Sequence, residues 1–354
     1  MEATTKAKDR FFTRLMKWLN QGLIIVTLLS YLSPFLHPEQ FSWISALGLI
    51  YPFLLLLNLL FLLYWGIRRK RYFLFSLVCV LLGWTFLSRN FGLSGTNERE
   101  VASLKIMTFN ASSGHYFPLP NAVGRDEKAF RTYVAAQDAE IICLQEFFYA
   151  PNFQKITTSE QQKYHFAYSD SRRLVIASIY PIKHYESLEF VNSSNGTLFA
   201  DVEVDGKMVR IYNTHLKSNQ ITDIVNEVAE EKKFKEKETW RKIKRIFEGY
   251  RKMAKVRATQ AENLAAHLAQ SPYPVILCGD FNDVPQSYAY ETLTKDLVDH
   301  FQVKGKGIGS TFAGNLPFLR IDYIMSSPSL KVVDSQIIKD GYSDHYPIVS
   351  YVAF

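Results

Sequence analysis

Three long apolar stretches precede residue 90, and no other feature of this chain restricts its folding as strongly. They run over about residues 19–36, 41–65 and 72–88. A helix needs roughly 20 predominantly apolar residues to cross the hydrocarbon core of a bilayer. The second stretch reaches this length, and the other two lie near the lower limit. The sequence therefore predicts three transmembrane helices, which make residues 1–89 a membrane anchor.

The basic residues of the short loops predict how such helices are oriented. Lys6, Lys8, Arg10, Arg14 and Lys17 lie in the N-terminal tail, residues 68–71 read Arg-Arg-Lys-Arg, and residues 37–40 contain no Lys or Arg. Loops rich in Lys and Arg stay on the cytoplasmic side of a membrane. We therefore expect a multi-pass protein of a bacterial inner membrane, with a cytoplasmic N-terminus and with the chain beyond residue 90 in the periplasm or outside the cell.

The rest of the chain has the pattern of a layered α/β domain. Residues 90–103 are polar and hold several Gly, Ser and Asn residues, which predicts a short linker. Beyond it, short β-rich runs such as 105–109, 141–144 and 275–278 alternate with helical segments. Such runs are typical of buried strands, and their alternation with helices indicates one layered α/β domain over residues 104–354.

A charged segment between about residues 221 and 270 differs from this pattern. It lacks proline, and Lys and Arg outnumber Asp and Glu between residues 231 and 257. Apolar residues recur there at helical spacing, at Trp240, Ile243, Phe247 and Tyr250. Two interpretations remain open. The segment is either a long solvated helix or helix pair packed through this stripe, or a basic arm that contacts the phosphates of lipid or nucleic acid.

Residues suited to metal binding and acid–base chemistry follow the ends of several predicted strands. They are Asn110, Glu146, Asn213, His215, Asp280, Asn282, Asp322, Asp344 and His345. Strand ends in layered α/β folds bring side chains that are distant in sequence to one edge of a sheet. An edge with carboxylates, amides and histidines but no cysteine suits a hard cation such as Mg²⁺ or Mn²⁺. Such a site can neutralise a phosphoryl group, position water and move a proton.

These residues lie in six short motifs with a fixed order. The motifs are Thr108-Phe109-Asn110, Leu144-Gln145-Glu146, Asn213-Thr214-His215-Leu216, Gly279-Asp280-Phe281-Asn282-Asp283, Arg320-Ile321-Asp322-Tyr323-Ile324 and Ser343-Asp344-His345. In this order they resemble the endonuclease/exonuclease/phosphatase superfamily over residues 104–354. The resemblance implies an α/β fold, a four-layer sandwich of two packed mixed β-sheets flanked by helices. The complete predicted fold is this sandwich preceded by the three transmembrane helices.

The resemblance also implies a metal site. Glu146 is then the main ligand of a Mg²⁺ or Mn²⁺ ion, with Asn110 beside it and Asp344 nearby. Whether the site holds one ion or two stays open.

The catalytic roles follow from the resemblance in the same way. Asp280 orients or activates the attacking water, helped by Asn282. His345 contacts the scissile phosphate or acts as the base, and Asp322 holds its tautomer. His215 binds phosphate or acts as the acid, and which histidine is the acid stays open.

The first motif departs from the pattern of the DNA-repair members. These members follow the asparagine with a Gly-x-Arg element, whereas this chain continues Ala111-Ser112-Ser113-Gly114-His115. The difference argues against cleavage at abasic sites.

The predicted function is metal-dependent hydrolysis of a phosphodiester, as in a nuclease, by in-line attack of a water that Asp280 positions. The alternative is a phosphoesterase that acts on a lipid headgroup, as a sphingomyelinase does, or on an inositol phosphate near the membrane. A non-enzymatic membrane scaffold is disfavoured because every expected catalytic position is filled. We expect a phosphoester substrate and the membrane as partners, and no protein partner.

Overall fold

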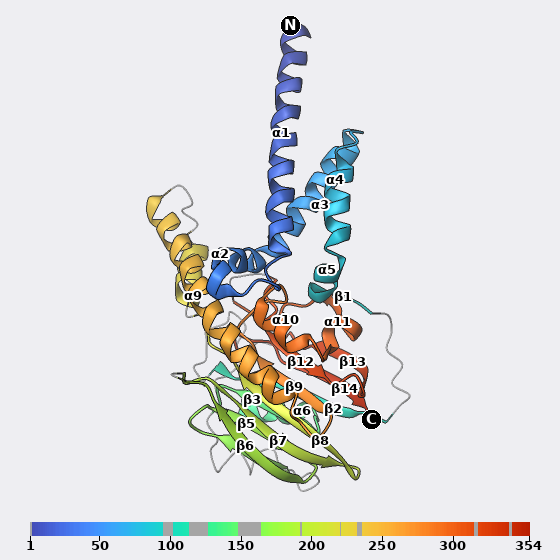
Figure 1. Cartoon of the computed structure of the whole chain (residues 1–354), viewed down its shortest axis with the longest axis vertical. Helices are drawn as coiled ribbons and strands as arrows, with labels where there is room; N and C mark the ends of the chain where they lie inside the picture. Colours follow the sequence, from blue (N-terminus) through green and yellow to red (C-terminus); the bar gives the residue numbers. More distant parts are fainter. Residues whose placement is uncertain are drawn as a thin grey trace.

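The computed structural model describes most of the chain. The described residues are 2–94, 102–112, 127–147, 164–191, 193–219, 221–231, 236–314, 318–339 and 342–354. Residues 95–101 of the predicted linker lie outside them. A column of helices stands on a body built of two β-sheets (Figure 1).

Five helices span residues 2–90. They are α1 (Glu2–Ser30), α2 (Pro38–Leu49), α3 (Tyr51–Ile67), α4 (Phe73–Leu82) and α5 (Trp84–Asn90). The axes of α2 and α3 differ by 52°, and those of α4 and α5 differ by 68°. The first bend lies at Ile50, two residues before Pro52. Proline has no N–H to donate to the carbonyl four residues earlier, and its ring would collide with that carbonyl, so one straight helix cannot continue through this point. The second bend lies at Gly83.

The prediction of three transmembrane helices is wrong. Among the described residues, no single helix has both the length and the apolar character that a membrane span requires, and only the two bent pairs reach them, by length and composition alone. The second and third apolar stretches are each broken inside, and α1 ends well before residue 36. Three further predictions depended on these helices and are contradicted as well. They are the multi-pass localisation, the embedding in a bacterial inner membrane and the outward-facing domain.

Neutral polar side chains join the helices of the column. Asn20 Nδ2 donates to Ser76 Oγ at 2.8 Å, and its Oδ1 accepts from Trp65 Nε1 at 3.0 Å. Asn58 Nδ2 donates to Thr27 Oγ1 at 2.8 Å. All of these side chains are buried, so each contact satisfies groups that have no access to water.

Two six-stranded sheets form the body of the molecule. One has the strand order β10-β12-β9-β8-β7-β6 and the other β13-β14-β2-β3-β5-β4. The strands of the first are β10 (Val298–Asp299), β12 (Asp322–Ser326), β9 (Val275–Asp280), β8 (Lys207–His215), β7 (Gly196–Val204) and β6 (Ile182–Glu189). Those of the second are β13 (Lys331–Ile337), β14 (Ile348–Ala353), β2 (Leu104–Asn110), β3 (Ile141–Gln145), β5 (Leu174–Ser178) and β4 (His165–Ser169).

One neighbouring pair in each sheet is parallel, namely β2 with β3 and β8 with β9. Parallel neighbours need a crossover, and helices provide it in both cases. The helix α6 (Glu127–Ala136) connects the first pair, and α8 (Thr222–Glu231) and α9 (Lys237–Leu268) connect the second. The charged segment of the sequence is thus a helix pair. The other neighbouring strands of the two sheets pair antiparallel.

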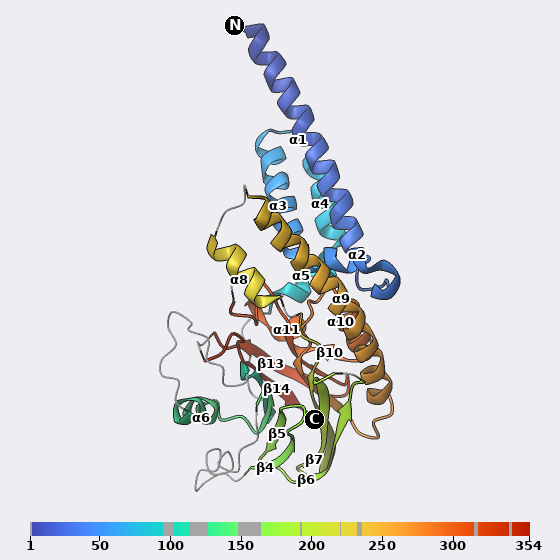
Figure 2. The ribbon, with the colours of Figure 1, turned by 90° about the vertical axis from the view of Figure 1, so that its left-hand side faces the viewer.

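Alternation along the strands explains the layers. In β9, Ile276 and Cys278 pack between the two sheets, whereas Leu277 faces the opposite side, where α9 and α10 (Tyr288–Thr294) cover it. In β2, Ile106 faces the inter-sheet core and Phe109 packs under α6. Helix, sheet, sheet and helix therefore form successive layers (Figure 2). This two-sheet α/β sandwich agrees with the corresponding part of the predicted fold.

Candidate active site at the strand ends

The carboxyl ends of the parallel strands lie at one edge of the sandwich. Asn110 ends β2, His215 ends β8 and Asp280 ends β9, while Glu146 follows β3. Asn110 Nδ2 donates to Asp280 Oδ2 at 2.9 Å, so the site joins the two sheets directly. A glycine is required before Asp280, because a Cβ at Gly279 would collide with the carbonyl of Thr214 and because its φ is +140°.

Asp280 lies at the centre of the site and is buried. Its Oδ1 accepts from the backbone N–H of Asn282 at 2.7 Å, and its Oδ2 accepts from Asn282 Nδ2 at 3.0 Å. Asp322 is its direct partner in the β9–β12 register. Burial raises the pKa of Asp280, and the nearby charge of Asp322 raises it further. The carboxylate is therefore a stronger base than an exposed aspartate.

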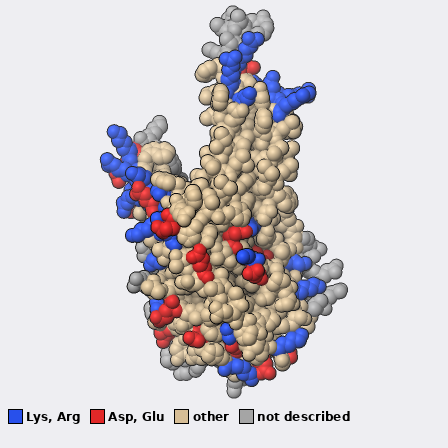
Figure 3. Space-filling model, in the orientation of Figure 1, with Lys and Arg blue, Asp and Glu red and all other residues tan. Residues whose placement is uncertain are grey.

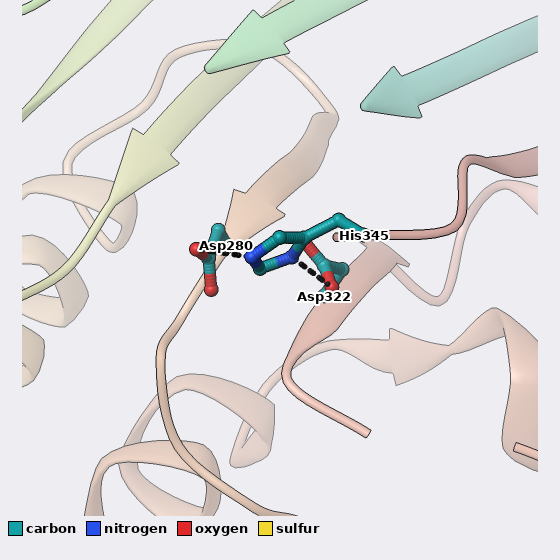
Figure 4. Close-up of side chains that lie close together, drawn as sticks. All are labelled: Asp280, Asp322 and His345. Atoms are coloured by element: carbon teal, nitrogen blue, oxygen red, sulfur yellow. Dashed lines mark hydrogen bonds and ion pairs between the residues drawn. The ribbon is translucent and has the colours of Figure 1, made fainter. Parts of the chain in front are cut away.

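His345 and Asp322 form a hydrogen-bonded pair (Figure 4). The imidazole Nδ1 lies 3.0 Å from Asp322 Oδ2, and Nε2 lies 3.9 Å from Asp280 Oδ2. Burial lowers the pKa of His345, but the attraction of the Asp322 and Asp280 carboxylates outweighs burial and raises the pKa well above its ordinary value. Nδ1 donates to Asp322 in this state, which leaves the Nε2 proton pointing toward Asp280.

His215 faces the same space from β8. Its Nε2 lies 3.7 Å from Asp280 Oδ2 and 3.8 Å from Glu146 Oε1, distances too long for direct hydrogen bonds. This buried nitrogen has no hydrogen-bond partner among the described residues. Burial lowers the pKa of His215 against the opposing effect of the two carboxylates. A buried, unsatisfied nitrogen between two acids indicates that a further polar group belongs there.

Glu146 differs from the other acids in its exposure and backbone. Its side chain is 28% exposed and borders the cavity. Its φ is +50°, a value that a non-glycine residue adopts only at an energetic cost. Asn282 also has a positive φ, +53°, which asparagine tolerates better. The local backbone is thus held in an unfavourable form at two of the predicted site residues.

A cavity of about 230 Å³ opens onto these groups. Glu146, Asp280, Asn282, Asp344 and His345 line its polar side. The other three residues with predicted roles contact this polar side from within the protein. Asn110 and His215 lie against Asp280, and Asp322 lies against His345. The structure therefore brings the eight residues with predicted roles to one region. Asn213, the ninth candidate, is buried and donates to the backbone carbonyls of Leu144 and Val175 instead.

The donor set suits a divalent cation. Ligand atoms of Asp280, Asp322 and His345 lie within 4.8 Å of one another. Both oxygens of Asp322 are already within 3.1 Å of His345 Nδ1, however, so an ion there would displace that contact. The partly exposed side chain of Glu146 borders the cavity and offers carboxylate oxygens on that side instead. Oxygen-rich surroundings without cysteine favour a hard ion.

A buried ion pair behind the site was not predicted from the sequence. Arg257 is fully buried in α9, and its Nε donates to Asp283 Oδ2 at 2.8 Å, while Tyr250 OH donates to Asp283 Oδ1 at 2.7 Å. Arg257 also donates to Asn219 Oδ1 at 2.7 Å. The pair fixes the loop that carries Asn282. A signal was present, since Arg257 falls on the small and apolar stripe of α9.

Comparisons of the sequence show two matched regions. A family model described as the endonuclease/exonuclease/phosphatase family matches residues 107–345, more than half of the chain. A second model, described as a domain of unknown function, matches residues 13–90. No curated protein matches the chain.

Solved structures share the fold of the sandwich. The D. rerio TDP2 structure with a single-strand DNA product has a TM-score of 0.51 and 17% identity, and the match covers 72% of this chain and 100% of that one. The human nocturnin catalytic domain with bound sulfate has a TM-score of 0.51 and 15% identity, with 73% and 96% covered. The Bacteroides vulgatus endonuclease/exonuclease/phosphatase has a TM-score of 0.51 and 15% identity, with 72% and 100% covered.

Proposed function

This chain belongs to the endonuclease/exonuclease/phosphatase family, and on that premise we propose that residues 104–354 are the catalytic domain of a phosphodiesterase that depends on a divalent metal ion. Members of this family are hydrolases that act on phosphoesters. The membrane-anchored bacterial subtype implied by the sequence is not supported. The proposal concerns the bond that is cleaved and the residues that cleave it.

One observation carries the proposal. Side chains from both sheets converge on Asp280, which lies within hydrogen-bond reach of Asn110 and Asn282 and within 4 Å of His215 and His345. Asp322 faces it across the strand register. Burying so many ionisable groups together costs free energy, and such clusters are typical of functional sites.

In the proposed site, Glu146 holds the metal ion, with Asn110 and Asp344 close by. A bound Mg²⁺ or Mn²⁺ would neutralise charge on the phosphoryl group and favour departure of the leaving oxygen. The partly exposed side chain of Glu146 and the cavity beside it leave room for such an ion. The positive φ of Glu146 is an unfavourable conformation of the kind that clusters at functional sites.

The remaining residues handle water and protons. Asp280 orients the attacking water and accepts its proton, because burial has raised its pKa. Asn282 holds the Asp280 carboxylate in place through two hydrogen bonds. His345 donates from Nε2 to a phosphoryl oxygen while Asp322 holds its Nδ1. His215, which burial keeps neutral, binds the phosphoryl group through its unsatisfied Nε2.

The first substrates to test are nucleic acids, because the D. rerio protein with this fold was crystallised with a single-strand DNA product. The full chain with Mg²⁺ is assayed on single- and double-stranded DNA, RNA, sphingomyelin and inositol phosphates. We expect cleavage of a phosphodiester that stops on addition of a chelator and returns with Mg²⁺ or Mn²⁺. Hydrolysis of monoesters alone would replace the phosphodiester assignment.

Glu146→Gln tests the metal role. It keeps the size of the side chain but removes the charge, and we expect kcat to fall by about 10²-fold or more, with weaker activation by Mg²⁺. Glu186→Gln makes the same change on the exposed strand β6 and serves as the matched control. Chelator-resistant hydrolysis, or full activity of Glu146→Gln, contradicts the proposal.

A further inference from the structure

Both polar and apolar side chains line the cavity beside the proposed catalytic groups. Together with the carboxylates and His345, six aliphatic side chains border it, which we call the apolar wall: Leu49, Ile221, Val225, Val284, Leu319 and Ile321. A phosphoryl group alone would gain nothing from this apolar surface. Apolar side chains in a pocket instead hold apolar parts of a ligand, while the few polar groups fix its orientation.

One part of the apolar wall comes from outside the sandwich. Leu49 is the last residue of α2. This helix belongs to the helical column and lies in residues 13–90, the region that the second family model matches. The remaining five residues of the wall lie in the sandwich or in its crossover α8. The column is therefore part of the cavity, and a chain cut before the sandwich would lose a piece of the wall.

Close contacts fix the corner between α2 and α3 against the sandwich. A Cβ at Gly48 would lie 2.5 Å from the carbonyl oxygen of Gln286, so only glycine allows this approach. On the far side of the corner, the ring of Phe53 meets that of Phe318 edge to face, with centroids 6.3 Å apart. Phe318 directly precedes Leu319 of the apolar wall. The corner therefore contributes to the wall through Leu49 and supports it through Phe53.

We propose that the α2–α3 corner is a specificity element of the catalytic pocket, and that the pocket takes a phosphodiester with an aryl or alkyl group next to the scissile phosphate. Leu49 is the specificity-determining residue, because it packs on that group while the polar side holds the phosphoryl oxygens. This inference rests on the proposed function, and it concerns the group that stays on the phosphate after the leaving group departs.

Two synthetic diesters test the inference with the full chain and Mg²⁺. Phenyl 4-nitrophenyl phosphate and methyl 4-nitrophenyl phosphate release the same 4-nitrophenolate, so they differ only in the retained group. We expect kcat/KM to be about tenfold higher for the phenyl ester, a ratio typical of one added apolar contact in a hydrophobic pocket. We expect Leu49→Asn to reduce that ratio to about twofold, because a polar amide next to the phenyl group replaces the apolar contact.

Three further variants separate specificity from folding. Leu49→Met keeps volume and apolar character, so the ratio should stay near the wild-type value. Leu47→Asn makes the polar change on the same helix but away from the cavity, and should also keep the ratio. Leu49→Ala covers the case in which Leu49→Asn loses its thermal unfolding transition, and should lower the ratio without adding a polar group.

Binding gives a readout that does not depend on turnover. Phenylphosphonate should bind the Mg²⁺-loaded full chain more tightly than methylphosphonate in calorimetry, and Leu49→Asn should remove most of that difference. Equal rates and equal affinities for phenyl and methyl compounds, or a ratio that Leu49→Asn and Leu49→Ala leave unchanged, overturn the inference while leaving the proposed function intact. If the chain hydrolyses neither synthetic diester but cleaves a diester of the nucleic acid and lipid panel, only the inference fails, and if it cleaves no diester at all, both fail.

Discussion

The helical column and the sandwich treat polar and apolar side chains in opposite ways. In α1–α4 the described buried polar groups are neutral, such as Asn20, Asn58 and Ser76, and many large apolar side chains lie outward, with Trp18 72% and Ile67 74% exposed. Figure 3 shows the column free of charge along most of its length, with Lys and Arg at its far end. The sandwich instead buries its charges in pairs. Neutral hydrogen bonds and apolar packing hold the column together, whereas the sandwich places paired charges in its interior, where they can serve chemistry.

Removing a charge from the site should have the largest effect. Asp280→Asn keeps the size and the strand pairing but removes the base, and we expect kcat to fall by about 10³- to 10⁴-fold with little change in thermal stability. In the column, Asn20→Ala removes a buried polar group of similar size, and we expect kcat to stay near the wild-type value while stability falls by about 1–2 kcal/mol. The comparison of regions fails if Asn20→Ala lowers kcat as strongly as Asp280→Asn.

Breaking the buried ion pair behind the site should be the largest stability effect. Arg257→Met leaves Asp283 charged and buried without its partner, and we expect the free energy of unfolding to fall by about 3–5 kcal/mol. Arg241→Met removes the same charge from an exposed pair with Glu238 on the same helix, where we expect at most about 0.5 kcal/mol. Urea unfolding of both variants measures the difference. Equal losses would show that burial of the pair does not matter.

The pH dependence of stability provides a third test in the sandwich. His300 lies between Ser350 Oγ, at 2.7 Å from Nδ1, and Ser326 Oγ, at 2.9 Å from Nε2, and so joins the two sheets. Burial lowers the pKa of His300 to about 4. Above about pH 6.5 the ring is neutral in both the folded and the unfolded chain, and the neutral His300 makes its full contribution to the free energy of unfolding. As pH falls from 6.5 to 4 only the unfolded chain takes up the proton, so stability decreases, by roughly 3 kcal/mol in total.

His300→Gln isolates this effect. Glutamine can still donate and accept hydrogen bonds but does not titrate, so the variant should lose about 2 kcal/mol less than the wild type between pH 7.5 and pH 5. Urea unfolding at the two pH values gives the comparison. His165→Gln, on the exposed face of β4, is the control and should keep the wild-type pH dependence. Identical pH dependence of His300→Gln and wild type would mean that His300 does not carry this term.

The two regions also differ in how far the sequence predicts them. The strand ends were predictable because short β-rich runs define where strands stop, and the motif order adds which residues follow. Asn110 and Asp280 are 170 residues apart in the chain, yet their side chains lie 2.9 Å apart as the strand pattern implies. Residues such as Leu49 were not predictable, because nothing local relates the end of α2 to a cavity between β-sheet loops.

The column was mispredicted for a physical reason. An apolar stretch specifies that its side chains leave water, but it does not specify one straight helix. Within the second stretch, backbone at Ile50 before Pro52 breaks the helix, and within the third the break falls at Gly83. Pro52 and Gly83 are of the two residue types that most often break helices. The apolar residues on either side of them nevertheless gave each stretch the average hydrophobicity of a membrane span. The contacts at Gly48 and Phe53 that hold the bend in place come from distant parts of the sandwich.

The junction between the two regions offers the smallest and finest test. Arg251 of α9 donates from Nε and Nη2 to Ser42 Oγ, and its guanidinium lies 3.4 Å from the ring centroid of Trp43. It is one of several junction contacts, since Arg89 of α5 also pairs with Glu291 of α10 at 2.8 Å. We therefore expect Arg251→Ala to lower the free energy of unfolding by only about 1 kcal/mol.

The effect of Arg251→Ala on the pocket is more informative than the small loss of stability. Arg251 holds α2, and α2 carries Leu49, so a looser junction should reduce the phenyl-to-methyl preference while leaving hydrolysis of the methyl ester unchanged. Lys252→Ala, an exposed neighbour on α9, should change neither quantity. If Arg251→Ala instead splits thermal unfolding into two transitions, the column and the sandwich fold as separate units. If stability and preference both match those of Lys252→Ala, the other junction contacts hold α2 without Arg251, and the comparison between regions no longer extends to the pocket.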